Sequence, residues 1–357
     1  MTITCARDSS LFLAAAGLDP LHADALCAEV PSLNASSDVA GLVDVLRRLV
    51  AVAGTADTFT AAECVAATRD LGLLLGSIRR HGPQPLAVVP AAVQTLLFLG
   101  ARTGMVPRDT VLHYGPGNPQ GPRRRRYVGG PAEDAMIESV RRSAPAVEDF
   151  IELLLELTGI DPGDPLFAEV CARTEPELDT LIAAMDLIRE HVPPAFFAQE
   201  MRPYFEPVDV GGRSYLGPAP AQLPLYLADT VLWASDQPVP GYAAFQSQVD
   251  EYNTPLVRSR YAARQGTGSL VSRLVGALRE SRDPSPALWA SVEGVRRILR
   301  RLIVFRGRHL TYARRTDDDL VRLFHHGSAG HTVDLPAEVL LLTREYRDVL
   351  ARHGSAG

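Results

Sequence analysis

Residues 292 to 315 carry the pattern that constrains the fold of this chain most strongly. Apolar residues recur there at steps of three and four, the period of an amphipathic helix with one buried face: Val295, Ile298, Leu299, Leu302, Phe305 and Leu310. His309 lies on the same face, four residues after Phe305, so its imidazole is expected to point into the protein. The other face is expected to meet water and carries Arg296, Arg297, Arg300 and Arg301.

A buried imidazole such as that of His309 needs a partner for each ring nitrogen. Hydrogen-bonding groups of the protein can supply both partners, in which case His309 is an ordinary core residue. One partner can instead be a metal ion, which a neutral imidazole binds through its unprotonated nitrogen. The helical spacing leaves both interpretations open.

The rest of the chain is also dominated by helical patterns, and few segments alternate as strands do. Two short helices separated at Gly17 to Pro20 are expected within residues 8–30, and a helix beginning after a Ser36–Ser37 cap is expected at 38–53. A short hairpin is expected between Val208 and Leu216. Further helices are expected at residues 60–80, 90–103, 133–158, 165–192, 195–205, 223–234, 240–262, 267–280 and 287–315. These patterns predict a mainly α protein.

A segment rich in Gly, Pro and Arg interrupts the helical patterns between residues 106 and 132, and it includes Arg123 to Arg126. Pro and Gly prevent regular structure and arginine favours water, so this segment is expected to be a solvated loop. We therefore predict a small N-terminal helical domain at residues 1–115, a linker at 116–132 and a large helical domain at 133–357.

The composition removes several classes of function. All 36 basic residues are arginine, and a chain without lysine can form neither an internal Schiff base with pyridoxal phosphate nor a P-loop lysine contact. The net charge of −6 argues against a general nucleic-acid binder, because such proteins present clustered positive charge to phosphates. No nucleic-acid partner is expected.

Two further observations concern location and thiol chemistry. No apolar run reaches the roughly 18 to 20 uncharged residues that a membrane-spanning helix needs, and the N-terminus lacks the pattern of a signal peptide. A cytoplasmic protein without membrane contact is therefore expected. The four cysteines form no C-x-x-C pair and are expected to be reduced packing thiols: Cys5, Cys27, Cys64 and Cys171.

A histidine cluster near the C-terminus offers a second candidate metal site. His325, His326 and His331 surround a glycine-containing loop, H-H-G-S-A-G-H, and imidazoles at this spacing could bind a transition metal without a porphyrin. Common catalytic spacings such as H-E-x-x-H, C-x-x-C and G-x-S-x-G are absent from the sequence. A non-haem metalloenzyme that uses this cluster therefore remains an alternative.

Three segments together resemble the haem-containing indoleamine 2,3-dioxygenase superfamily. F-R-G-R-H-L at residues 305–310 is similar to the segment that carries the proximal haem ligand. H-V-P-P-A-F-F-A-Q-E-M-R-P-Y-F at 191–205 is similar to the segment that contacts the amino-acid substrate, and G-S-A-G-H-T at 327–332 resembles the loop that closes over it. The resemblance implies a two-domain helical fold whose large domain holds haem b.

The resemblance also implies individual roles. His309 matches the axial iron ligand and Arg306 the arginine that meets a haem propionate. Phe197 and Arg202 match the substrate-contacting pair, and Ser328 matches a serine with catalytic and substrate-binding roles. Each role has an ordinary alternative: an ion pair for Arg306, a salt bridge to Glu200 or Glu206 for Arg202, and core packing for Phe197. Tyr204 and Phe205 are expected to be core residues.

Within the superfamily the sequence is most similar to monodechloroaminopyrrolnitrin synthase-like haem enzymes. M-R-P-Y-F-E-P, the following G-G-R-x-Y-L-G-P turn and a serine nineteen residues after His309 support this likeness. The chain differs at Asp317, where these enzymes carry a tyrosine. The likeness implies a monomeric or homodimeric oxygenase that uses dioxygen on tryptophan or a similar aromatic amino acid in specialised metabolism. Insertion of one oxygen atom and insertion of two both stay open. A helical ligand-binding protein without catalytic activity is a further alternative.

Overall fold

A computed structural model describes residues 8–318 and 334–354, and helices dominate both segments. The only sheet within these residues is an antiparallel hairpin of β1 (Val208–Val210) and β2 (Arg213–Tyr215), in which Asp209 pairs with Ser214. The prediction of a mainly α fold with a short hairpin after residue 207 is therefore confirmed.

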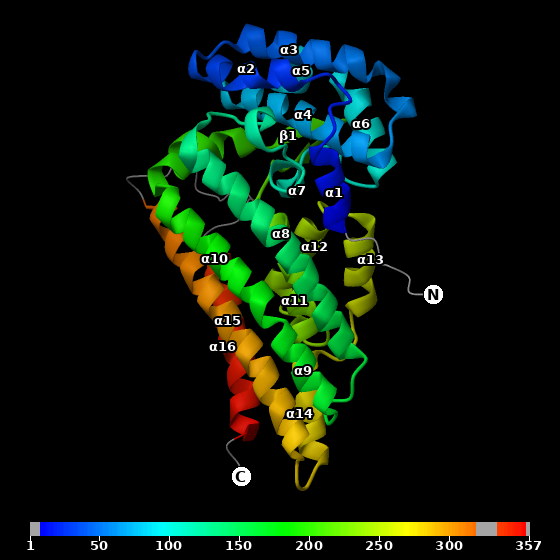
Figure 1. The fold of residues 1–357 in the computed structure, drawn as a ribbon, viewed down its shortest axis with the longest axis vertical. Helices are drawn as coiled ribbons and strands as arrows, with labels where there is room; N and C mark the ends of the chain where they lie inside the picture. The colour runs from blue at the N-terminus through cyan, green and yellow to red at the C-terminus, as the bar shows by residue number, and fades with distance from the viewer. Residues whose placement is uncertain (1–7, 319–333, 355–357) are drawn as a thin grey trace.

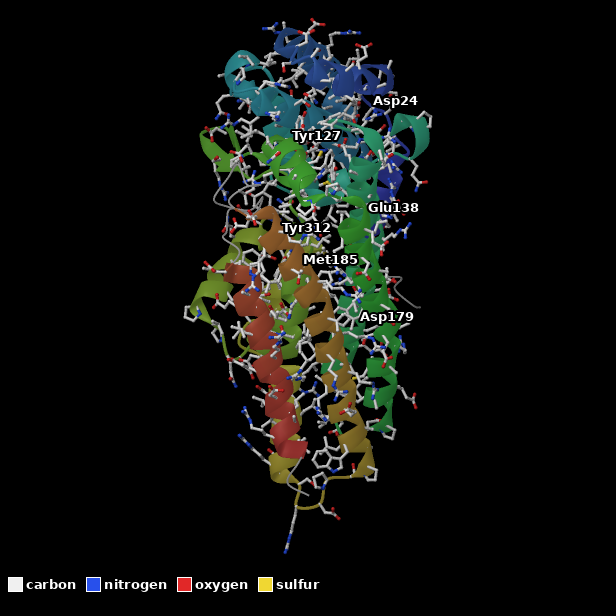
Figure 2. All side chains as sticks on the ribbon, turned by 90° about the vertical axis from the view of Figure 1, so that its left-hand side faces the viewer. Asp24, Tyr127, Glu138, Asp179, Met185 and Tyr312 are labelled. Atoms are coloured by element: carbon white, nitrogen blue, oxygen red, sulfur yellow. The ribbon has the colours of Figure 1, made fainter. Side chains whose placement is uncertain are left out.

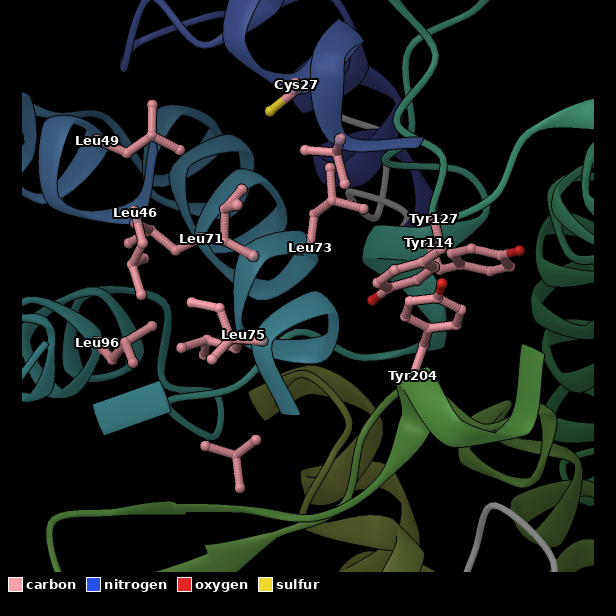
Figure 3. Packing of buried hydrophobic residues seen from close by; sticks show 14 of the residues in the cluster. Cys27, Leu46, Leu49, Leu71, Leu73, Leu75, Leu96, Tyr114, Tyr127 and Tyr204 are labelled. Atoms are coloured by element: carbon pink, nitrogen blue, oxygen red, sulfur yellow. The ribbon is translucent and has the colours of Figure 1, made fainter. Parts of the chain in front are cut away.

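The N-terminal helices gather at one end of an elongated molecule (Figure 1). They are α1 (Asp8–Ala16), α2 (Asp24–Ala35), α3 (Val39–Val52), α4 (Ala61–Arg80), α5 (Pro85–Val88) and α6 (Ala92–Thr103). Helix α4 begins at a capping box, because Thr60 Oγ1 accepts from the Glu63 amide at 3.3 Å and the Glu63 carboxylate accepts from the Thr60 amide at 2.8 Å. Buried leucines of α3, α4 and α6 form the core of this end, as Figure 3 shows for Leu46, Leu71 and Leu96.

Long helices run along the axis of the molecule below this end (Figure 1). Helix α8 packs against α10, and α15 packs against α9, α10 and α16. The elements of this part are α7 (Val111–Tyr114), α8 (Gly130–Thr158), α9 (Pro165–Arg173), α10 (Glu175–His191), α11 (Leu225–Asp229), α12 (Pro240–Asp250), α13 (Pro255–Arg264), α14 (Leu270–Glu280), α15 (Pro286–Thr316) and α16 (Asp334–Gly354).

Helix α15 confirms the amphipathic helix that the apolar spacing predicted at residues 287–315. Ser285 caps its first turn by accepting a hydrogen bond from the Leu288 amide at 3.2 Å, and Pro286 occupies the first helical position, where no amide hydrogen is needed. Val295, Leu299 and Leu302 are fully buried. Among the helices of the described segments, none combines the length and apolar character that crossing a bilayer would require.

Several helix boundaries differ from the sequence expectation. Asp38, rather than the Ser36–Ser37 pair, caps α3, because its carboxylate accepts from the Gly41 amide at 2.9 Å while Ser37 adopts a left-handed turn conformation. The pattern at 165–192 divides into α9 and α10 at Thr174, and the pattern at 240–262 divides before Pro255. Pro176 and Pro255 lie in the first turns of α10 and α13, where proline is tolerated best because its missing amide hydrogen is not needed.

Two expected α-helices contain wider or tighter turns. Phe196–Met201 forms a π-helical turn that continues into a 3-10 turn at Arg202–Phe205, and Thr230–Ala234 forms a second π-helical turn after α11. π-Helical turns are rare, and they occur frequently at functional sites. Both flank the candidate active site described below.

The Gly-, Pro- and Arg-rich segment is packed into the protein, so the expectation that Arg123 to Arg126 form a solvated loop is wrong for Arg125. That residue is 2% exposed, and its guanidinium donates to Asp70 Oδ1 at 2.8 Å and Asp24 Oδ1 at 2.7 Å. Arg69 donates to the same Asp70 oxygen at 2.7 Å. The carboxylates of Asp70, which is buried, and Asp24, which is partly exposed, come from distant helices and hold the arginine inside. Composition alone cannot reveal these contacts. The domain boundaries stay a prediction.

The buried Asp70 carboxylate predicts how the fold responds to acid. Burial opposes its ionisation, but the charges and hydrogen bonds of Arg69 and Arg125 lower its pKa below 3.8. The folded state therefore holds this proton less tightly than the unfolded state. The ionised Asp70 carboxylate therefore contributes to the free energy of unfolding. This contribution is fully present above about pH 4 and is lost as the pH falls through the lowered pKa.

We expect the free energy of unfolding, measured with urea between pH 3 and 7, to fall steeply only below about pH 4. The Asp44→Asn variant, which changes an exposed carboxylate of α3, is the control. Its free energy of unfolding should fall over the same pH range as that of the wild type. A loss of stability that is already complete at pH 5 would contradict the assigned direction for Asp70.

Candidate active site

An apolar cavity of about 390 Å³ lies between α8, α10, α11, α12, α15 and α16. Met185 of α10 and Tyr312 of α15 both line it, and Figure 2 places them near the middle of the molecule. This volume is within the range of cofactor and small-molecule pockets, roughly 300–1,000 Å³. The cavity brings together four of the predicted site residues, which are Phe197, Arg202, Arg306 and His309.

His309 lines the cavity from α15, as its helical position predicts. Its ring borders the cavity and is therefore only partly covered, and it stacks on Phe305 at a centroid distance of 6.3 Å. Burial and the nearby charge of Arg306 lower the pKa of His309 below 6.5, so the imidazole is neutral at pH 7. No hydrogen bond joins its ring to another side chain of residues 8–318 and 334–354. A neutral imidazole in this setting can bind a metal.

Arg306 lies in the same wall, three residues before His309, and makes a buried ion pair. Its Nη2 donates to both carboxylate oxygens of Asp229 at 2.6 Å, and its Nη1 donates to Thr343 Oγ1. The Tyr242 hydroxyl donates to Asp229 as well, at 2.5 Å. Arg306 and Asp229 are 6% and 1% exposed, so the ion pair is an interior one rather than a surface one. It fixes the guanidinium at the cavity wall.

Phe197 and Arg202 enter the cavity from the π-helical turn and the 3-10 turn that follow α10. The Phe197 ring packs against Tyr312 of α15, with centroids 6.3 Å apart. Arg202 is 8% exposed and donates to Glu206 Oε1 at 2.6 Å, the salt bridge that the sequence offered as an alternative role. Tyr204 and Phe205 are buried in the core, as expected, and Phe205 also borders the cavity.

Other cavity residues were not predicted from the sequence. Tyr114 of α7 lines the cavity and belongs to an aromatic stack with Tyr127 and Tyr204, which Figure 3 shows at the boundary with the N-terminal helices. Ser139 and Ser143 of α8 also line the cavity, and the hydroxyl of each donates to a backbone carbonyl. Of these residues, only Asp229 stands out in the sequence, because it is the one acidic residue of the apolar segment 223–234.

Some predicted residues lie outside the described part of the chain. Ser328, the loop at 327–332, and His325, His326 and His331 all fall in residues 319–333. Their assigned roles stay predictions. Within residues 8–318 and 334–354, no group of three His, Cys, Asp or Glu side chains is arranged to hold a metal ion. Cys27, Cys64 and Cys171 are buried free thiols, as expected.

A comparison with protein families identifies the chain. The family described as monodechloroaminopyrrolnitrin synthase PrnB matches residues 14–294, which is more than half of the 357-residue chain. The matched span contains Phe197 and Arg202 and ends within α15, before Arg306 and His309. The chain belongs to the monodechloroaminopyrrolnitrin synthase family, within the indoleamine 2,3-dioxygenase superfamily.

Proposed function

We propose that this protein is a haem b-dependent oxygenase that uses dioxygen on tryptophan or a tryptophan-like aromatic amino acid in specialised metabolism. The observation that carries the proposal is the His309 imidazole facing an apolar cavity that is also lined by Arg202, Arg306 and Phe197. Membership in an oxidoreductase family supports the same conclusion.

The residues of the cavity fit haem b. His309 would bind the iron, and Arg306, already oriented by Asp229, would meet a propionate at the edge of the macrocycle. The apolar side chains of α8 and α10 suit the faces of a porphyrin. When bound, haem iron supplies the activation of dioxygen. No side chain of the protein then needs to act as a strong base.

The protein's own residues bind and orient the substrate. The planar guanidinium of Arg202 is suited to two parallel hydrogen bonds with a substrate carboxylate. The Phe197 ring offers an apolar face to the substrate's aromatic ring. Apolar side chains such as Met136, Val140 and Met185 exclude water from the remaining wall.

The Arg202→Ala variant is expected to bind an aromatic amino acid about 10- to 100-fold more weakly, because it removes charge-assisted hydrogen bonds to the carboxylate. Haem content should stay unchanged. Equilibrium titration of haem-loaded protein with L-tryptophan measures the loss. Arg189→Ala, which removes an exposed arginine of α10, is the matched control. Equal affinity in the Arg202 variant and the wild type would exclude this role.

Oxygen consumption tests the proposed activity itself. Reduced, haem-loaded protein is expected to consume dioxygen when a tryptophan analogue is added, with conversion of the aromatic substrate followed by mass spectrometry. Haem-loaded protein that consumes no dioxygen with any indole-bearing amino acid would contradict the proposal and favour a ligand-binding protein.

A further inference from the structure

Asp317 ends the cavity-facing side of α15. His309, Tyr312, Ala313, Thr316 and Asp317 all line the cavity, and their spacing of three and four residues places them on one side of the helix. Asp317 follows His309 by eight residues, which corresponds to about 12 Å along a helix axis. A carboxylate therefore stands in the cavity wall about two turns beyond the imidazole.

The backbone of α15 adds negative potential at the same place. Asp317 is the C-terminal cap of this 31-residue helix, and the carbonyl groups of a helix C-terminus carry a partial negative charge. An acidic residue is disfavoured there by the helix dipole, whereas a cation is favoured. The carboxylate and the helix end together suit a positively charged group of a ligand.

The turns that carry Phe197 and Arg202 are joined to the C-terminal part of α15 through Tyr312. The Tyr312 hydroxyl donates to the Val192 carbonyl at 3.2 Å, and the Tyr312 ring contacts Phe197. These contacts join α15 to the segment that carries Arg202. Arg202 and Asp317 both line this cavity, so its wall contains a guanidinium from the turn and a carboxylate from the end of the helix, the two charges complementary to an amino-acid zwitterion.

We propose that Asp317 is a specificity-determining residue that binds the α-ammonium group of the substrate, while Arg202 binds its carboxylate. This inference rests on the proposed function and adds to it the residue that selects substrates with a free amine. It also gives a physical role to the position at which similar enzymes carry a tyrosine, because a carboxylate and a phenol present different charges to the ligand.

Three indole ligands test the Asp317–ammonium contact and the Arg202–carboxylate contact independently. L-Tryptophan has both charged groups, tryptamine has only the ammonium, and indole-3-propionate has only the carboxylate. We expect Asp317→Asn to weaken the binding of L-tryptophan and tryptamine about tenfold and to leave indole-3-propionate unchanged. Arg202→Ala should give the opposite pattern, with tryptamine unchanged. Equilibrium titration of the haem-loaded proteins provides the dissociation constants, with no need for turnover.

Asp318→Asn is the matched control, because Asp318 is the next residue along the chain, carries the same charge and is exposed. It should bind all three ligands as the wild type does, and circular dichroism should show that all the variants are folded. The inference is overturned if Asp317→Asn binds tryptamine as tightly as the wild type, or if it weakens all three ligands equally. Wild-type protein that binds none of the three ligands would instead contradict the proposed function, and this inference with it.

Discussion

Replacing His309 with alanine is expected to lower haem retention by about tenfold or more, because the change removes the imidazole that we propose as the iron ligand. The measurement is the Soret absorbance per protein chain after haem supplementation and removal of unbound haem. The side chain is lost at the edge of an existing cavity, so the variant should fold. Added imidazole should restore part of the haem binding by entering the vacated space.

His191→Ala provides the comparison, because His191 is an exposed histidine at the end of α10. It should retain haem as the wild type does. If the His309 variant bound haem with an unchanged spectrum, another residue would have to be the axial ligand. The cluster of His325, His326 and His331 would then be the first set to replace.

The Asp229→Ala variant is expected to lose about 3–5 kcal/mol of folding stability, because it leaves the Arg306 guanidinium buried without its counter-charge. The pair is almost inaccessible to solvent, with exposed fractions of 6% and 1%. The variant also removes the acceptor of the Tyr242 hydroxyl. Urea unfolding of the protein without added haem measures the loss.

A second substitution separates the buried charge from simple loss of packing. Asp229→Ala combined with Arg306→Met removes both charges and should be more stable than Asp229→Ala alone. Glu156→Ala breaks an exposed ion pair with Arg173 and should change stability by less than about 1 kcal/mol. An Asp229→Ala effect as small as that of Glu156→Ala would show that the interior pair adds little to the fold.

The sequence was sufficient to predict the helices whose pattern is local. The apolar residues of α15 recur within one element, so both the helix and the inward direction of His309 could be derived before the structure. The boundaries that were wrong depended on single side chains, such as Asp38 at the cap of α3. Helix α16 was not predicted at all, although Leu340 and Leu350 are buried in it.

Contacts between distant residues could not be derived from the sequence. Arg125 is buried because it meets Asp70, 55 positions away, and Arg306 is fixed by Asp229, 77 positions away. Spacing along the chain carries no information about such pairs. The family resemblance assigned site roles to four residues that line the cavity. It did not indicate that Tyr114 and Asp229 line the same cavity.

The central claim is that the neutral His309 imidazole binds haem iron in the cavity beside α15. Resonance Raman spectroscopy of the reduced, haem-loaded wild-type protein tests it most directly. We expect one haem per chain and an iron–histidine stretching band that disappears in the His309→Ala variant. Absence of stoichiometric haem binding, or a spectrum with the same iron–histidine band in that variant, would contradict it.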